Sequence, residues 1–502
     1  MDLMLTGFAM VADPAIIGVI LIGVIIGVLV GALPGLSSPM AIALLIPFTI
    51  PMTPIAAIAM LAGLYCAGTF GGSITAILIN APGAPPAAAT ALDGYPMAKR
   101  GEAGRALGLA TISSVTGGIL SLLILLLAAP LLARIAITFT SAEYFALALF
   151  ALSMLASISG KSSIRNLIAG FVGVFLSTIG IHLTTGVERF TFGVNELYDG
   201  LPFVPVLIGL FAVAELLKQS RVGETVFERV RANVMKLPSR QDFQRIKYTV
   251  LRSSGLGTFI GILPAEGATV AAIMGYNEAR RWSDRKEEFG TGIPEGIAGP
   301  EAANNAATGG AMVPTLALGI PGSVSTALIL GAMVMHGLKP GPYLLENQPQ
   351  FLYAIFAAML IANLAFMAIG IAGAKLFSQL TLIPRTILWP SVLVFAIIGS
   401  YAHSSSFFDI WVMAIAGIVG YFMLRIGFGP APLIMGLVLG PIVEENFSKA
   451  MIIHDNSILS MMERPLVLLF FGLTILSLAG PVRSAIKARR NRNLLMATKE
   501  GE

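Results

Sequence analysis

Long apolar stretches separated by short polar ones run along most of the chain. The clearest apolar stretches lie at 15–30, 106–129, 144–158, 167–181, 203–214, 351–374, 388–398, 410–424 and 466–478. A helix needs about 20 apolar residues to cross a lipid bilayer, and several of these stretches approach that length. Together with the broken apolar regions between them, the pattern predicts an all-α polytopic membrane protein with roughly 11–13 membrane segments.

Composition agrees with this interpretation. Of the 502 residues, 56% are hydrophobic and only 12% are charged, and the mean hydropathy is +0.84. Soluble domains contain about 25% charged residues. Lys and Arg gather in the loops between apolar stretches, so the net charge of +5 fits contact with a lipid bilayer and does not indicate nucleic-acid binding.

The longest polar stretch divides the chain into halves of similar length. Residues 218–252 hold nine Lys or Arg against three acids, and Val222, Val226 and Val230 fall near helical spacing. This pattern is typical of a basic amphipathic helix lying on the cytoplasmic membrane surface. We therefore expect a first transmembrane repeat half at 1–217, a basic cytoplasmic linker helix at 218–252, a second transmembrane repeat half at 253–482, and a basic cytoplasmic tail at 483–502.

The two halves share a series of Gly- and Pro-containing motifs in the same order. GALP at 31–34 corresponds to GILP at 261–264, and DGYP at 93–96 corresponds to HGLKP at 336–340. Between them, Gly71-Gly72 is followed by nine residues and then Pro82-Gly83, whereas Gly309-Gly310 is followed by ten residues and then Pro321-Gly322. Each match alone is weak, but the shared order predicts an internal duplication, as in many secondary transporters.

Charge predicts how the two repeats are oriented. In the first half, residues 37–54 carry no charge, and Lys99, Arg100 and Arg105 follow the second motif. In the second half the order is reversed, because the basic residues at 280–286 precede the corresponding motif. If basic loops face the cytoplasm, the two repeats enter the membrane from opposite sides. We therefore expect inverted repeats with broken helices or re-entrant hairpins, and a cytoplasmic C-terminus.

The repeated breaks are the candidate substrate site. Pro and Gly end helices inside the apolar region, and broken backbone is tolerated in a membrane only where it is buried in protein or lines a wet cavity. Free N–H groups at the helix starts attract carboxylates. A lone break is more simply explained by packing, but a duplicated one favours function. The substrate-binding candidates are Ser37, Ser38, Ser73, Asn80, Pro82, Gly83, Asn304, Asn305, Gly319, Pro321, Gly322, Ser323 and Thr326.

Carboxylates within apolar surroundings are expensive and often functional. Glu266, Glu301 and Glu444 are therefore candidates for coupling to a cation, whereas Asp93 and Asp409 are more simply explained as loop or interfacial groups. The four histidines have no metal-ligand spacing, so we expect no structural metal and no cofactor; Na+ or H+ would act as a coupling ion. No nucleotide-binding or nucleophile motif is present, which argues against an enzyme.

Several long segments resemble the large membrane subunit of the tripartite tricarboxylate transporters, the TctA family. They read GALPGLSSPMAIALLIPFT, FGGSITAILINAPGAPPAAATALDGYPMAKRGEAGRALG, IPEGIAGPEAANNAATGGAMVPTLALGIPGSVSTALILGAMVMHGLKPGP and GLVLGPIVEENF. The resemblance extends over nearly the whole chain.

The resemblance implies a bacterial inner-membrane permease that works with two partners. These are a small membrane subunit (TctB-like) and a periplasmic solute-binding protein (TctC-like) that delivers the substrate. It also implies uptake of di- or tricarboxylates driven by Na+ or H+. A stand-alone permease for another small solute and, less favoured, an intramembrane enzyme are the alternatives that the sequence leaves open.

Overall fold

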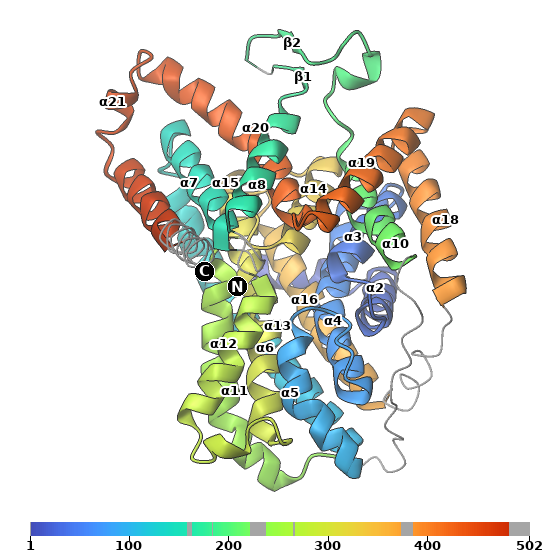
Figure 1. Ribbon diagram of the computed structural model, residues 1–502. Coiled ribbons are helices and arrows are strands. Elements are labelled where there is room, and N and C mark those ends of the chain that lie inside the picture. Colours follow the sequence, from blue (N-terminus) through green and yellow to red (C-terminus); the bar gives the residue numbers. More distant parts are fainter. Residues whose placement is uncertain are drawn as a thin grey trace, which may run out of the picture. The chain divides into compact units, whose positions relative to one another are not determined.

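The computed structural model describes residues 2–157, 163–182, 184–220, 237–264, 267–372 and 385–480. Within these ranges the chain is almost entirely helical (Figure 1) and divides into two compact units. The first comprises Met1–Ile137 and Pro202–Tyr421, and the second comprises Thr138–Leu201 and Phe422–Glu502. This agrees with the predicted all-α polytopic fold.

The first unit contains all the repeated motifs. Its helices in the first half are α1 (Asp2–Val11), α2 (Pro14–Ala32), α3 (Ser38–Thr49), α4 (Pro54–Ile79), α5 (Ala87–Met97) and α6 (Ala103–Ala136). Those from the rest of the chain are α9 (Phe203–Ile208), α10 (Ala214–Gln219), α11 (Arg240–Ile262), α12 (Gly267–Trp282), α13 (Pro294–Leu318), α14 (Val324–Met335), α15 (Pro342–Asn347), α16 (Pro349–Ala372), α18 (Arg385–Ser404) and most of α19 (Phe407–Arg425).

The second unit is built around α8 (Ser163–Ser177) and α20 (Pro430–Ile453), which pack closely together and against α7 (Ser141–Met154). A short antiparallel pair, β1 (Gly180–Ile181) and β2 (Glu188–Arg189), joins Gly180 to Arg189. The short helix α21 (Ile458–Met461) follows α20, and an apolar helix, Pro465–Gly480, follows in turn.

The two halves of the first unit have the same element order. In each, a helix ends at a Leu-Pro break and is followed by a short helix, a long buried helix, a second break, another short helix and a further long helix; the second half has the additional short helix α15 before the last of these. The series α2, α3, α4, α5, α6 thus corresponds to α11, α12, α13, α14, α16. Small residues bring α2 against α4, with Gly23 beside Met60, and bring α11 against α13, with Gly257 beside Ala303.

The two long buried helices α4 and α13 run in opposite directions where they meet. Ser73 contacts Glu301, and Thr69 contacts Asn304 through a longer hydrogen bond of 3.5 Å, so residue numbers fall along α4 as they rise along α13. Inverted repeats require this antiparallel arrangement of equivalent helices. Because both helices are buried along almost their whole length, their crossing forms the centre of the unit.

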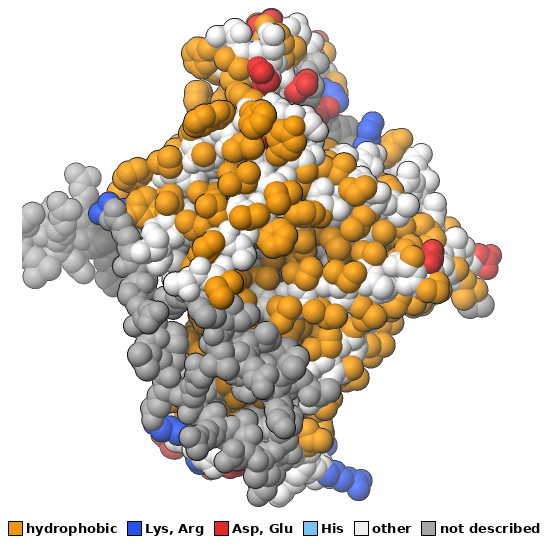
Figure 2. Space-filling model, turned by 90° about the vertical axis from the view of Figure 1, so that its right-hand side faces the viewer, with side chains coloured by type: hydrophobic (Ala, Val, Ile, Leu, Met, Phe, Trp, Pro, Cys, Tyr) orange, Lys and Arg blue, Asp and Glu red, His pale blue; other side chains and the backbone are white. Residues whose placement is uncertain are grey.

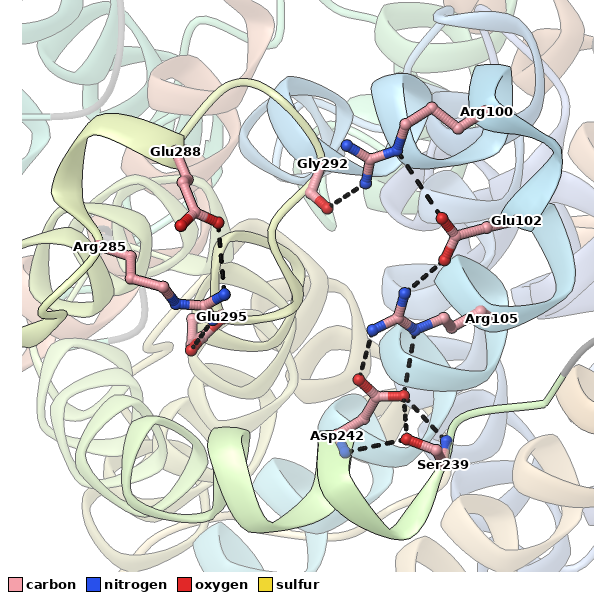
Figure 3. A network of polar contacts seen from close by, with 9 residues as sticks. All are labelled: Arg100, Glu102, Arg105, Ser239, Asp242, Arg285, Glu288, Gly292 and Glu295. Atoms are coloured by element: carbon pink, nitrogen blue, oxygen red, sulfur yellow. Dashed lines mark hydrogen bonds and ion pairs between the residues drawn. The ribbon is translucent and has the colours of Figure 1, made fainter.

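The loops predicted to share one side of the membrane do lie together. Arg105, at the start of α6, binds Asp242 of α11 through Nη2 and Oδ1, 2.5 Å apart, and Arg100 donates to the carbonyl oxygen of Gly292 at 2.6 Å. The basic loop of the first half thus contacts α11 and the loop before α13 in the second half. Figure 3 shows these contacts and, beside them, a separate set formed by Arg285, Glu288 and Glu295. This contact between the two halves is what inverted repeats and the positive-inside rule together predict.

One face of the molecule is rich in apolar side chains. Figure 2 shows a face covered largely by hydrophobic side chains, with charged ones sparse across its middle; Leu127 is 76% exposed and Ile415 is 59% exposed. Six helices among the described residues are long and apolar enough to cross a membrane, with several shorter apolar helices beside them. A surface of this kind is stable only in contact with lipid.

Within the basic stretch at 218–252, residues 221–236 lie outside the described residues, as does the tail from 481 onward. From Arg240 the chain is already part of α11. The proposed cytoplasmic linker helix and tail therefore remain predictions.

Candidate functional site

Both long helices end at a residue with left-handed backbone. At the end of α4, Asn80 has φ 52° and its N–H donates to Thr75 O. At the end of α13, Gly319 has φ 72° and its N–H donates to Pro314 O. When Asn80 is taken as the equivalent of Gly319, Gly71 becomes the equivalent of Gly310. In this alignment the distance from the glycine to the end of the helix is the same in both halves, although the Gly-Gly pairs themselves are offset by one residue.

The two Pro-Gly pairs that follow lie in close-packed backbone. A Cβ on Gly83 would overlap the carbonyl oxygen of Gly31, in the last turn of α2, and a Cβ on Gly322 would stand 2.7 Å from Ala311 Cα in α13. Glycine is needed at both positions because no other residue permits so close an approach. The Pro-Gly break of each half therefore packs against a helix of the same half, α2 in the first and α13 in the second.

The starts of two short helices approach the same turn of α4. Ser38, the first residue of α3, places its Oγ 2.6 Å from the position that a Cβ on Gly68 would take. Ser323, the residue that caps α14, lies 3.1 Å from Tyr65 through the two hydroxyl oxygens. The positive ends of the α3 and α14 dipoles are thus brought to residues 65–68, where an anion would be stabilised.

Several predicted hydroxyl groups are engaged in caps. Ser37 accepts a hydrogen bond of 3.4 Å from Met40 N at the start of α3. Ser323 and Thr326 cap each other's backbone, with Thr326 N donating to Ser323 Oγ at 3.2 Å and Ser323 N donating to Thr326 Oγ1 at 2.8 Å. These side chains fix the beginnings of the short helices that flank α4.

Two asparagines at the crossing have unfilled hydrogen-bonding capacity. Asn304 and Asn305 of α13 are fully buried, yet neither amide atom of Asn305 nor Oδ1 of Asn304 has a hydrogen-bond partner. Buried amides are nearly always paired, because an unpaired one costs about 1–3 kcal/mol. The two side chains are therefore suited to receive a polar ligand between α4 and α13.

Glu301 lies about one turn before these asparagines and is also fully buried. Its carboxylate accepts hydrogen bonds from Ser73 and Thr90, and from Ser114 Oγ at 2.6 Å. These hydroxyls come from α4, α5 and α6. Ser73, predicted as a substrate ligand, is thus placed against the carboxylate of Glu301.

Two carboxylates differ from their expected positions. Asp93 and Asp409 were predicted as loop or interfacial groups, but the structure buries both, leaving them 0% and 2% exposed. Asp93 accepts hydrogen bonds from the backbone N–H groups of the loop before α13, and Asp409 accepts one of 2.7 Å from Ser404. Burial is possible because these partners, distant in sequence for Asp93, replace water.

The other cation-coupling candidates, Glu266 and Glu444, remain predictions. Glu266 lies outside the described residues. Glu444 belongs to the second unit, where it pairs with Arg189 through Nη2 and Oε2, 3.0 Å apart, and with His182 Nε2 at 3.6 Å. Among the described residues no group of three or more His, Cys, Asp or Glu is arranged to hold a metal ion.

Away from the crossing of α4 and α13, Arg105 and Asp242 form an ion pair. Burial raises the pKa of Asp242, but hydrogen bonds from Arg105 and Ser239 lower it more, so its pKa lies below the ordinary value. The carboxylate is 2% exposed and joins α11 to α6 (Figure 3).

Sequence reasoning missed Tyr65, Thr69, Thr90 and Ser114. Tyr65, Thr69 and Ser73 follow one another at intervals of four residues in an apolar helix, which places them on one face. The four-residue spacing from Ser73 back to Thr69 and Tyr65 is therefore a signal in the sequence that could have identified Tyr65 and Thr69. Thr90 and Ser114 carry no comparable signal, because only the fold brings α5 and α6 to Glu301.

Comparison with known proteins places these residues in a family context. The sequence matches the Tripartite tricarboxylate transporter TctA family over residues 17–435, a span that includes the whole crossing. It is 40% identical over 443 residues, 88% of each chain, to an uncharacterized 52.8 kDa protein in the TAR-I ttuC′ 3′ region of Agrobacterium vitis. An uncharacterized protein in the TAR-II ttuC′ 3′ region of that organism is 36% identical over 235 residues, 47% of this chain and 97% of the relative. No solved structure matches.

Proposed function

The chain belongs to the tripartite tricarboxylate transporter TctA family, and on that premise we propose that it imports an organic di- or tricarboxylate as the large permease subunit. In this proposal a periplasmic solute-binding protein (TctC-like) delivers the substrate, and a small membrane subunit (TctB-like) completes the complex. A Na+ or H+ gradient drives uptake by alternating access, as symport across the bacterial inner membrane.

The observation that carries the proposal is the convergence of two helix starts and two buried amides with unpaired atoms on the crossing of α4 and α13. The starts of α3 and α14 approach residues 65–68 of α4, and the amides of Asn304 and Asn305 lie on the facing helix. Such an arrangement stabilises a carboxylate by dipoles and N–H groups and needs no fixed arginine. The two halves contribute one long helix each, so movement of one against the other exposes the crossing alternately.

Uptake of labelled carboxylates by the reconstituted three-component complex tests this proposal. Proteoliposomes receive a panel of mono-, di- and tricarboxylates, with Na+ and pH gradients imposed separately. We expect accumulation of at least one di- or tricarboxylate, dependent on the binding protein. Ser323→Leu, which removes the cap of α14 and its contact with Tyr65, is expected to abolish this uptake while the protein still reaches the membrane. Normal uptake by that variant would contradict the proposed site.

The alternative is a stand-alone permease for another small solute. Uptake by this chain alone, unaffected by addition of the binding protein, would favour that alternative. Turnover of a bound carboxylate would instead favour an intramembrane enzyme, for which the TctA family gives no support.

A further inference from the structure

The surroundings of Glu301 distinguish it from the other acids in the first unit. It is fully buried, and its two carboxylate oxygens accept hydrogen bonds only from hydroxyl groups among its described side-chain partners: Ser73, Thr90 and Ser114. Three other buried acids of this unit have a basic or backbone partner: Asp242 binds Arg105, Glu295 binds Arg285, and Asp93 accepts backbone N–H groups. A fourth, Asp409, accepts one hydrogen bond from the hydroxyl of Ser404, whereas Glu301 accepts three. Within the described residues no Lys, Arg or His forms an ion pair with Glu301.

A charge in this position requires compensation. An uncompensated buried carboxylate costs several kcal/mol, and three neutral hydroxyls offset only part of that cost. Each hydroxyl is both a donor and an acceptor. The same three groups that donate to a bare carboxylate therefore offer their oxygen lone pairs once a positive charge arrives, because each O–H bond rotates.

We propose that Glu301, Ser73, Thr90 and Ser114 form the binding site for the cation that drives transport. This site binds one positive charge, either H+ or Na+, through oxygen atoms alone. A bound H+ forms an O–H group with one carboxylate oxygen, and this group donates a hydrogen bond to a hydroxyl oxygen. A bound Na+ is instead coordinated by the carboxylate and hydroxyl oxygens. This assignment rests on the proposed function, because it names the coupling site of that transporter.

The neighbouring asparagines give independent evidence that a ligand binds here. Asn304 and Asn305 lie three and four residues after Glu301 on the same helix, fully buried and with unpaired amide atoms. A carboxylate substrate at these amides would lie close to the negative charge of Glu301. Neutralising Glu301 therefore favours substrate binding, and the substrate in turn favours the cation, which is the reciprocity that coupled transport requires.

The site also joins the two repeats. Glu301 belongs to α13 of the second half, whereas its three hydroxyl partners belong to α4, α5 and α6 of the first half. The bound cation stabilises this boundary, and its loss leaves a buried charge there. Occupancy at Glu301 is thus linked to the relative position of the two halves.

The first test measures binding without transport. The thermal unfolding midpoint of the purified three-component complex is followed while pH is lowered in Na+-free buffer, and while Na+ is raised at fixed pH. We expect one of the two cations to raise the midpoint, and Glu301→Gln, which resembles the neutralised carboxyl group, to lose that response. Glu295→Gln on the same helix is the matched control and should respond as the wild type does. A wild type that neither cation stabilises, or a Glu301→Gln variant that keeps the response, would overturn the assignment.

The second test separates the coupling site from the transport function. In proteoliposomes, Glu301→Gln is expected to lose about tenfold or more of its gradient-driven accumulation but to keep exchange of labelled for unlabelled carboxylate. Ser114→Ala should raise the cation concentration needed for half-maximal uptake several-fold without changing exchange. The pH-gradient and Na+-gradient arms identify the cation.

Failures of the two proposals are distinguishable. Full gradient-driven uptake by Glu301→Gln, or an unchanged cation requirement in Ser114→Ala, refutes the coupling site while leaving carboxylate transport established. Absence of carboxylate uptake by the wild type refutes the proposed function, and the unfolding measurements then decide the cation site by themselves. If Glu301→Gln does not fold, Ser114→Ala and Thr90→Val provide the same comparison.

Discussion

Asp93 and Gly292 come from opposite halves of the repeat, and the Gly292 amide donates a hydrogen bond of 2.7 Å to Asp93 Oδ1. The same oxygen accepts from Gly290 N at 2.9 Å and from Ile293 N at 3.0 Å, while Tyr276 donates to Oδ2. Asp93 thereby accepts hydrogen bonds from the backbone N–H groups of the loop that precedes α13. In the corresponding motif of the second half, His336 Nε2 lies 3.0 Å from the Oγ1 of Thr49, the last residue of α3.

Asp93→Ala should be strongly destabilising. It leaves several buried N–H groups without an acceptor, and we expect the free energy of unfolding to fall by about 3 kcal/mol or more. Asp93→Asn keeps an acceptor oxygen and should cost less. Thermal unfolding of the detergent-solubilised protein measures the difference. The exposed Asp284 in the same loop region is the control, since Asp284→Ala should change stability by less than about 0.5 kcal/mol.

The close packing at Gly83 predicts a second result. A Cβ there would overlap the backbone of the last turn of α2, so Gly83→Ala should displace the break from α2 and abolish uptake. Gly18 has no neighbour within 4 Å of the position of a Cβ, and Gly18→Ala should transport normally. Quantifying protein in the membrane fraction separates lost function from lost folding. Equal uptake by the two variants would show that this packing does not matter.

Asn80 allows its backbone and side chain to be tested separately. Its φ of 52° suits Gly as well as Asn, so Asn80→Gly keeps the break and removes only the amide. If the amide binds substrate, Asn80→Gly should raise the substrate concentration for half-maximal uptake severalfold. Asn80→Leu should abolish uptake, because it also strains the backbone. A Gly variant with wild-type uptake would limit the role of Asn80 to ending α4.

The pair formed by Arg105 and Asp242 predicts a dependence of stability on pH. The pKa of Asp242 is lowered in the folded state, so its contribution is fully present above the pKa of an unfolded Asp and is lost as the pH falls through the folded pKa. Asp242→Asn should therefore reduce the unfolding midpoint at neutral pH and have less effect in acid. Asp284→Asn provides the comparison. A loss that is constant with pH would show that the charge of Asp242 is not responsible.

Local sequence was sufficient for the membrane fold and for the position of the breaks. Apolar stretches form helices in lipid because no water satisfies their backbone groups, and Pro and Gly end helices wherever they stand in the chain. The left-handed residues at 80 and 319 and the two Pro-Gly pairs fall where these rules predict. The charges at 99–105 and 280–286 likewise predicted loops on one side, and Arg100 of the first stretch contacts Gly292, in the loop that follows the second.

The sequence by itself determined an all-α membrane protein with a duplicated, broken-helix core, because those properties depend on residues close together in the chain. Only the tertiary structure decided which polar groups meet. Glu301 and Ser114 are 187 residues apart in sequence, and Asp93 is buried because a distant loop supplies its hydrogen bonds. The free energy of burying a polar group depends on its partners in space, and those partners are fixed by the crossing of α4 and α13.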